Sequence, residues 1–202
     1  MTLLAEAPTT QRTVLHVGCG MADPRKLPSA FFAPGVWREV RLDIDPGVTP
    51  DIVATITDMA AVDSGSVDAV WSAHNLEHLF AHEVPLALAE FRRVLRPEGF
   101  ALVTVPDLQR AAELVAQDGL DLPAYISPAG PIAPLDMLFG HGAAIAAGNH
   151  FMAHRTGFTA RTLEAALRHA GFGIVRVVRD DAFALWATAF AAPAPSISSK
   201  SG

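Results

Sequence analysis

The chain has 202 residues, of which 50% are hydrophobic, and a formal net charge of −6. This length suits one domain with a large core, and no apolar run reaches the roughly 18 uninterrupted residues that a bilayer span requires. The acidic balance argues against a broad surface that follows nucleic-acid phosphates. The single cysteine, Cys19, excludes an internal disulfide and suits a reducing compartment. Because residues 1–12 also lack the basic start and apolar core of a secretory signal, we expect a cytoplasmic protein.

The first expected strand, residues 13–17, runs directly into Gly18, Cys19 and Gly20. Glycine permits positive φ and lets a ligand approach the backbone closely. A strand, a glycine turn and a helix are a general way to hold a nucleotide-like ligand. The same glycines could serve only a tight bend, so a second observation is needed before the turn counts as a binding site.

Two carboxylates close the second expected strand, which covers residues 40–44. Asp43 follows Gly18 by 25 residues, near the roughly 20-residue offset at which an acid after the second strand reaches a ribose diol. A carboxylate suits this task because its two oxygens can accept both hydroxyl protons. The alternative is that Asp43 and Asp45 form a solvated turn before Pro46.

The next elements alternate between helices and strands. A short first helix over residues 27–32 is all that Pro24, Pro28 and Pro34 leave room for. Pro85 suits the first position of a longer helix that continues to Arg96. Further strands are expected at residues 51–56, 67–73 and 100–105.

This alternation predicts right-handed crossovers and a parallel sheet. Ligands of such sheets bind at the carboxyl ends of the strands. The polar and glycine residues expected at that edge are Gly18, Asp43, Asp58, His74 and Asp107.

Five segments, in order, carry a resemblance: VLHVGCG, RLDIDP, DIVATITDM, SVDAVWSAHNLEHL and EFRRVLRPEGFALVTVPD. Together they resemble the class I S-adenosylmethionine-dependent methyltransferases, particularly the small-molecule type with an LEH segment after the fourth strand. The resemblance covers about residues 13–108 and is echoed more weakly at residues 154–172. It implies an α/β fold with a Rossmann-like, doubly wound, mostly parallel seven-stranded sheet whose last strand is antiparallel. Residues 173–178 and 183–190 would supply the final two strands.

The resemblance implies S-adenosylmethionine as the cofactor. Gly18 and Gly20 would let the first turn approach the methionine part, and Asp43 would take the ribose hydroxyls. Two positions depart from the family pattern. His16 stands where an acid commonly helps to hold the methionine ammonium group, and Ala22 replaces a usual third glycine.

Other cofactor contacts are implied after the third and fourth strands. Asp58 and Met59 would meet the adenine, although a register shift of three residues would put Thr55 there instead. Ser72 and His74 would lie beside the sulfonium.

Methyl transfer requires chiefly that a nucleophile be aligned with the methyl group and that water be excluded. A base is needed only if the acceptor must lose a proton. His74 is the catalytic candidate because imidazole titrates near neutral pH. The alternative is that His74 only caps backbone groups, and His78 is expected to pack within the following helix.

Residues 109–156 depart from a minimal fold. After a helix to about residue 117, the segment is rich in Pro, Gly, His and apolar residues, and a long stretch without regular structure is typical of a functional lid. Phe139 and Phe151 are expected to help form an apolar acceptor pocket beneath it. The predicted substrate residues are Tyr125, His141, His150 and His154.

The same histidines raise the question of a metal. His150 and His154 are four residues apart, a spacing that would put both on one helix face, and Asp136 or His141 would be the residue to complete a site. No strong third ligand stands at a set spacing, so we expect ordinary lid histidines and no metal.

The sequence therefore predicts one methyltransferase domain over residues 1–191, with a lid or substrate segment at about 109–156 and a disordered tail at 192–202. The predicted function is methyl transfer from S-adenosylmethionine to a small-molecule or carrier-borne acceptor, without nucleic acid or a membrane span. The alternatives are a non-catalytic S-adenosylmethionine-binding module and a nicotinamide-dependent oxidoreductase. The acceptor, the pathway and the oligomeric state are left open.

Overall fold

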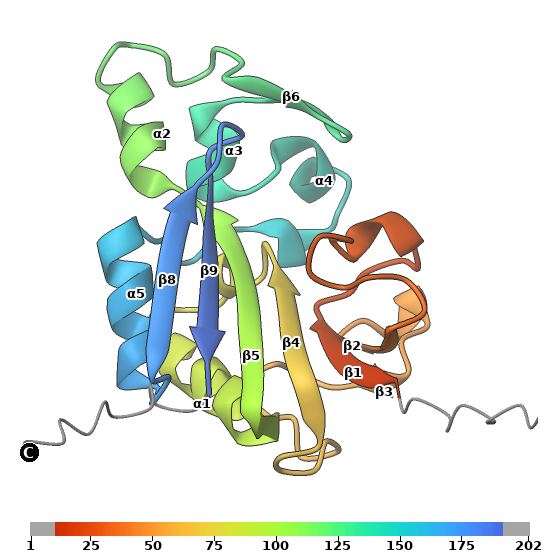
Figure 1. The fold of residues 1–202 in the computed structure, drawn as a ribbon. Helices are drawn as coiled ribbons and strands as arrows, with labels where there is room; N and C mark the ends of the chain where they lie inside the picture. The colour runs from red at the N-terminus through yellow and green to blue at the C-terminus, as the bar shows by residue number, and fades with distance from the viewer. Residues whose placement is uncertain (1–10, 192–202) are drawn as a thin grey trace, which may run out of the picture.

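A computed structural model describes residues 11–191, so the tail predicted at 192–202 lies outside the described residues. Its main strands are β1 (Arg12–Val17), β2 (Trp37–Asp43), β3 (Ile52–Val53), β4 (Val67–Ala73), β5 (Leu95–Pro106), β8 (Ile174–Arg179) and β9 (Ala184–Phe190). They form one sheet in the order β3-β2-β1-β4-β5-β9-β8 (Figure 1). The first five strands pair in parallel, and β9 is antiparallel to both β5 and β8. The predicted seven-stranded, mostly parallel sheet with an antiparallel last strand is confirmed.

Two helices, α1 (Val84–Val94) and α5 (Ala160–His169), pack on one face of this sheet. Their apolar residues recur at helical spacing, which gives each helix one buried stripe. The side chains buried in this layer include Leu88 and Phe91 of α1, Leu163 and Leu167 of α5, and Leu15, Val17 and Val70 of the sheet.

Helix α1 ends two residues before the predicted Arg96. Pro97 disfavours the helical conformation in the residue before it, and Leu95 is already extended. The carbonyls of Arg93 and Val94 accept hydrogen bonds from the backbone of Gly65 and Ser66. The loop before β4 thus satisfies the end of the helix, and the chain passes directly into β5.

The opposite face of the sheet is covered by aromatic packing. The helix predicted at residues 27–32 is absent, because the prolines leave only the single 3-10 turn η1 (Pro24–Lys26) and further turns. Phe32 is buried in its place, with its ring 5.2 Å from the ring of Trp37 and 6.0 Å from that of Phe100.

The segment after β5 holds short regular elements, where the sequence predicted little beyond one helix. They are α2 (Leu108–Val115), β6 (Tyr125–Ser127), β7 (Gly130–Ile132), α3 (Pro134–Phe139), α4 (Gly142–Ala146) and η4 (His150–Met152). Figure 1 shows them gathered beyond the arrowheads of β4 and β5. The two ends of the segment meet, since the backbone N–H of Leu108 donates to the carbonyl of Phe158 at 3.0 Å.

Two further 3-10 turns, η2 (Pro46–Val48) and η3 (Leu76–His78), follow β2 and β4 at the carboxyl edge of the sheet. Among the helices of residues 11–191, none combines the length and the hydrophobicity needed to cross a membrane.

Candidate active site

The glycine turn after β1 takes the conformation that the sequence predicts. Gly18 and Gly20 both have φ of +58°, in the region that favours glycine. A Cβ atom on Gly18 would lie 2.3 Å from Nδ2 of Asn75, so no larger residue fits there without displacing that side chain. Nδ2 of Asn75 is buried and has no hydrogen-bond partner among residues 11–191. A donor without a partner beside the glycine turn is suited to an acceptor group of a ligand.

Asp43 lies at the end of β2, next to this turn. Its Oδ2 accepts a hydrogen bond from the backbone of Gly20 at 2.8 Å, and its Oδ1 accepts one from the backbone of Asp45 at 2.9 Å. A carboxylate oxygen can accept two hydrogen bonds. Asp43 is thus fixed in place while each of its oxygens keeps capacity for a ligand hydroxyl.

A cavity of about 340 Å³ opens over these residues at the carboxyl edge of the sheet. Three groups line it: the ends of β1 and β2, the residues after β3, and side chains from η3 and from the segment around η4. The lining residues are Gly18, Gly20, Asp43, Ile44, Asp45, Val48, Ala54, Thr55, Ile56, Thr57, His74, Asn75, His78, Leu79, Glu83, Asn149, Phe151, Met152 and Arg155. Gly18, Gly20 and Asp43 therefore line one cavity, and their contacts with a cofactor stay a prediction.

Three predicted cofactor residues do not line this cavity. Asp58 is exposed. Met59 is completely buried, and its backbone is held by hydrogen bonds with Glu90 and Arg93. Ser72 is also fully buried. The residues that line the cavity after β3 run from Ala54 to Thr57, and they include Thr55, the residue of the alternative register.

A second cavity, of about 220 Å³, lies beneath the segment between β5 and α5. It is lined by His74, Glu77, His78, Pro106, Tyr125, Ala129, Ile132, Asp136, Met137, His141, Met152, His154 and Phe183. His74, His78 and Met152 line both cavities. The two spaces are therefore neighbours that share a wall at the end of β4.

The predicted substrate residues divide between this cavity and the surface. Tyr125, His141 and His154 line it, whereas His150 is exposed and lines neither cavity. Among the predicted pocket phenylalanines, Phe151 lines the first cavity and Phe139 is 63% exposed. Tyr125 stacks on Phe183 with ring centroids 5.9 Å apart, and burial raises the pKa of its hydroxyl.

His74 occupies the shared wall in an unusual backbone conformation, with φ of +49°. Its Nδ1 lies 3.2 Å from Oε1 of Glu77, a side chain that is only 1% exposed. Burial alone would lower the pKa of His74, but the hydrogen bond to Glu77 and the charge of that carboxylate raise it overall. Burial alone would raise the pKa of Glu77, but the same hydrogen bond and the charges of His74 and His78 lower it overall.

Two residues at this site received no role in the sequence-based predictions. Glu77 received no role, although its position three residues after His74 and directly before His78 was the available signal. Asn75 also received no role, and no local pattern distinguishes it from an ordinary loop residue.

His16, which departs from the expected acid, does not line either cavity. It is 2% exposed, and its Nδ1 lies 2.6 Å from Oε1 of Glu39 on β2. Burial lowers the pKa of His16, helped by the charges of Lys26 and Arg41, and Glu39 offsets only part of the effect.

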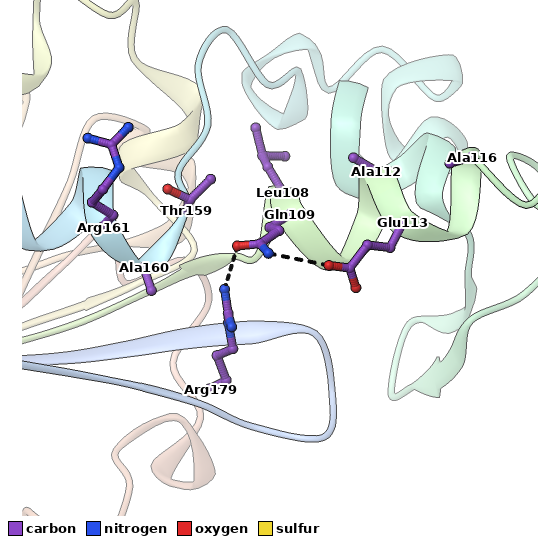
Figure 2. A pocket seen from close by; sticks show the side chains of 9 residues that line it. All are labelled: Leu108, Gln109, Ala112, Glu113, Ala116, Thr159, Ala160, Arg161 and Arg179. Carbon is purple, nitrogen blue, oxygen red and sulfur yellow. Dashed lines mark hydrogen bonds between the residues drawn. The ribbon is translucent and has the colours of Figure 1, made fainter.

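An open depression of about 780 Å³ lies elsewhere, between α2 and the start of α5 (Figure 2). Three of its polar side chains bind one another. Gln109 donates to Glu113 at 3.3 Å and accepts from Arg179 at 2.7 Å. None of the buried unpartnered polar atoms of residues 11–191 belongs to this surface, and the glycine turn lies elsewhere, so we place the candidate site at the two smaller cavities.

Comparison with known proteins bears on the family and the fold. Residues 15–103 match a family model described as a methyltransferase domain. A search of curated proteins found no match to the chain.

Solved structures with the same fold include three methyltransferases or methyltransferase domains. The CMeT domain of the citrinin polyketide synthase aligns with a TM-score of 0.59 and 15% identity over 92% of this chain and 48% of that one. The 1,6-didemethyltoxoflavin-N1-methyltransferase of Burkholderia thailandensis was solved with 1,6-didemethyltoxoflavin and S-adenosylhomocysteine. It aligns with a TM-score of 0.54 and 19% identity over 89% of this chain and 71% of that one. A SAM-dependent methyltransferase from Methanosarcina mazei aligns with a TM-score of 0.56 and 14% identity over 91% of this chain and 93% of that one. The chain thus spans about half the length of the citrinin synthase structure.

Proposed function

We propose that this chain, whose residues 15–103 match a methyltransferase domain, is a class I S-adenosylmethionine-dependent methyltransferase that transfers a methyl group to a small-molecule or carrier-borne acceptor. The observation that carries the proposal is the pair of cavities that share His74, His78 and Met152. A methyl donor in the first cavity and an acceptor in the second would meet at this wall.

The first cavity suits the cofactor because its polar groups match those of a nucleoside joined to an amino acid. Asp43 offers acceptors to the ribose hydroxyls, and the unpartnered Nδ2 of Asn75 offers a donor to the methionine carboxylate. Thr55, Ile56 and Thr57 would surround the adenine, in place of Asp58 and Met59. The proposed methionine contact is at Gly18 and Gly20, where the backbone is accessible.

The second cavity suits a small acceptor. Its volume of about 220 Å³ is below the roughly 300–1,000 Å³ of drug-sized ligand pockets. Tyr125 and Phe183 provide an aromatic wall, and His141 and His154 provide polar points. The toxoflavin enzyme, bound to its small acceptor and S-adenosylhomocysteine, is a precedent for a small-molecule acceptor on this fold.

The sulfonium methyl of the bound cofactor is already a strong electrophile. The protein therefore has to orient the acceptor, exclude water and, for a protonated nucleophile, accept a proton. His74 is the proposed base, because it lies on the shared wall and Glu77 orients its ring through Nδ1. In that arrangement Nε2 of His74 is the atom available to take the proton.

The testing experiment is calorimetric titration of the purified chain with S-adenosylhomocysteine, with NADH as a parallel ligand. We expect micromolar binding of the first and none of the second. An acceptor panel with labelled S-adenosylmethionine follows. Binding of NADH alone would support an oxidoreductase, and cofactor binding with no labelled product across the panel would support a non-catalytic binding module.

A further inference from the structure

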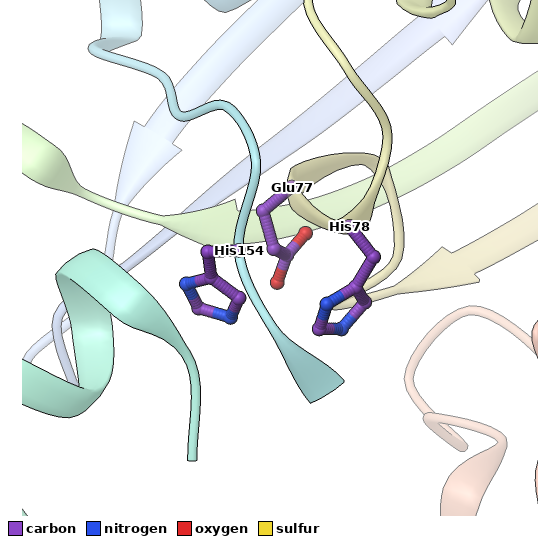
Figure 3. A group of neighbouring side chains, drawn as sticks. All are labelled: Glu77, His78 and His154. Carbon is purple, nitrogen blue, oxygen red and sulfur yellow. The ribbon is translucent and has the colours of Figure 1, made fainter. Parts of the chain in front are cut away.

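Three side chains able to bind a metal converge on the second cavity (Figure 3). Glu77 and His78 come from η3, and His154 comes from the segment just after η4. One potential ligand atom of each side chain lies within 4.8 Å of those of the other two. Figure 3 shows the Glu77 carboxylate between the two imidazole rings.

Backbone hydrogen bonds orient both histidines for this task. Nδ1 of His154 lies 2.9 Å from the carbonyl oxygen of Met137, and Nδ1 of His78 lies 3.2 Å from that of Ala153. A carbonyl oxygen only accepts, so Nδ1 is the donor in each ring, and Nε2 of the neutral ring keeps a lone pair. Metal-binding histidines are commonly oriented by this kind of hydrogen bond from the other ring nitrogen.

Glu77 contributes an oxygen that the described chain does not satisfy. His74 contacts Oε1, but Oε2 is buried and has no hydrogen-bond partner among residues 11–191. A buried carboxylate oxygen without a partner is unfavourable. A cation held between this oxygen and the two imidazoles would remove that cost.

The backbone brings the two parts of the cluster together. The carbonyl of Glu77 accepts hydrogen bonds from the backbone N–H groups of Arg155, at 2.8 Å, and Thr156, at 3.2 Å. These bonds attach the chain directly after His154 to η3. The cluster is therefore preorganised by main-chain contacts, which a chance meeting of surface side chains would lack.

We propose that Glu77, His78 and His154 bind a Zn²⁺ ion, with an open coordination position toward the second cavity. Two imidazoles and one carboxylate form a donor set of catalytic zinc sites, in which a further position holds water or substrate. Zinc–ligand bonds of about 2.0–2.2 Å bring ligand atoms to roughly 3.4 Å from one another in a tetrahedral site, so small side-chain rotations complete the geometry. This proposal departs from the sequence expectation of ordinary lid histidines and no metal, and the partners of His154 in it are Glu77 and His78 and not His150.

A zinc ion at this site would favour acceptors with a hydroxyl or thiol group, a consequence that rests on the proposed function. A hydroxyl or thiol acceptor bound at the open position would lose its proton more readily, because zinc lowers the pKa of a coordinated group. His74, hydrogen-bonded to the other oxygen of Glu77, would lie beside the metal-bound group and take that proton.

The experiment is titration of chelator-treated full-length protein with Zn²⁺, followed by calorimetry, and with Co²⁺, followed by visible absorption. We expect one Zn²⁺ per chain and cobalt ligand-field bands of a low-coordinate nitrogen and oxygen site. Glu77→Gln and His154→Gln should each weaken Zn²⁺ binding at least tenfold and change the cobalt spectrum. The control His169→Gln should change neither, because His169 bonds only to its own helix and lies outside both cavities.

Thermal melting of each variant, and its binding of S-adenosylhomocysteine, report whether the fold is retained. No zinc binding, or equal binding by wild type and both folded variants, would overturn the metal site. Neither titration uses the cofactor or an acceptor. The metal result therefore stands even if S-adenosylhomocysteine fails to bind, and that failure would count against the proposed function alone.

Discussion

Nδ1 of His74 lies 3.2 Å from Oε1 of Glu77, which joins a half-exposed imidazole to a buried carboxylate. His74 also has a positive φ of +49°, a conformation that costs free energy in residues other than glycine and tends to persist at functional sites. Glu77 holds the ring at the wall between the two cavities. This pairing is the reason for assigning His74 a role beyond capping the end of β4.

Replacing His74 by glutamine tests its role as the base. We expect His74→Gln to lower turnover of an acceptor found in the panel by about 10²- to 10⁴-fold, the usual contribution of a general base. Affinity for S-adenosylhomocysteine should remain within about twofold, since glutamine leaves the cavity walls largely intact. His82→Gln, at an exposed residue outside both cavities, is the control. Unchanged turnover in His74→Gln would exclude it as the base.

Asp43→Ala tests the proposed ribose contact. The variant should bind S-adenosylhomocysteine more weakly by roughly 1.5–3 kcal/mol, the scale of hydrogen bonds to a charged group. Part of the loss would come from the backbone of Gly20 and Asp45, which Asp43 also holds. Calorimetry on Asp63→Ala, an exposed carboxylate outside the cavity, provides the comparison. Equal affinities in the two variants would remove Asp43 from the site.

A pair of glycine substitutions separates backbone strain from loss of the site. Gly18 and Gly35 both have positive φ, but a Cβ atom meets Asn75 at Gly18 and nothing within 4 Å at Gly35. Each alanine variant should lose about 1–2 kcal/mol of unfolding free energy from the left-handed conformation, measured by urea denaturation. Only Gly18→Ala should also bind S-adenosylhomocysteine at least about tenfold more weakly, a loss of roughly 1.4 kcal/mol. Equal binding by both variants would mean that the turn makes no close approach to the ligand.

The buried His16 makes stability depend on pH. Its pKa in the folded protein lies below the ordinary value because burial outweighs the contact with Glu39. As the pH falls below about 6.5, the ordinary pKa of histidine, the unfolded chain takes up a proton before the folded chain does. This residue therefore destabilises the fold on acidification, with a slope of at most about 1.4 kcal/mol per pH unit.

His16→Gln isolates this contribution, because glutamine can still donate to Glu39 and does not titrate. Urea unfolding of both proteins between about pH 8 and pH 5 should show the wild type losing stability relative to the variant below about pH 6.5. A difference that stays constant over this range would contradict a lowered pKa. The groups facing His16 whose charges act on it are Glu39, Lys26 and Arg41.

The sheet was predictable because its strands are coded locally. The glycine turn after β1 and the acid after β2 stand at the ends of apolar runs, and the carboxyl ends of parallel strands meet at one edge. The helix expected at 27–32 was wrong, since the three prolines allow turns and leave Phe32 to cover that face.

The site was less predictable, because it depends on where residues distant in sequence meet. Spacing placed Asp43 near Gly18, yet Asp58 and Met59, the residues predicted to meet the adenine, lie outside the cavity that Thr55 lines. Spacing also paired His154 with His150. The structure pairs His154 with Glu77 and His78, which lie more than 70 residues earlier. No local pattern in the sequence encodes that contact, which depends on backbone bonds from Arg155 and Thr156 to Glu77.

The two ends of the segment between β5 and α5 lie side by side. Leu108 and Phe158 are joined by a backbone hydrogen bond, so the segment between β5 and α5 begins and ends at one point. Residues between them could be exchanged for a segment of another length with little entropic penalty, because loop-closure entropy grows slowly with length. If this segment binds the acceptor, as we propose, acceptor choice can diverge by exchange of this one segment, while the strands that line the first cavity stay unchanged.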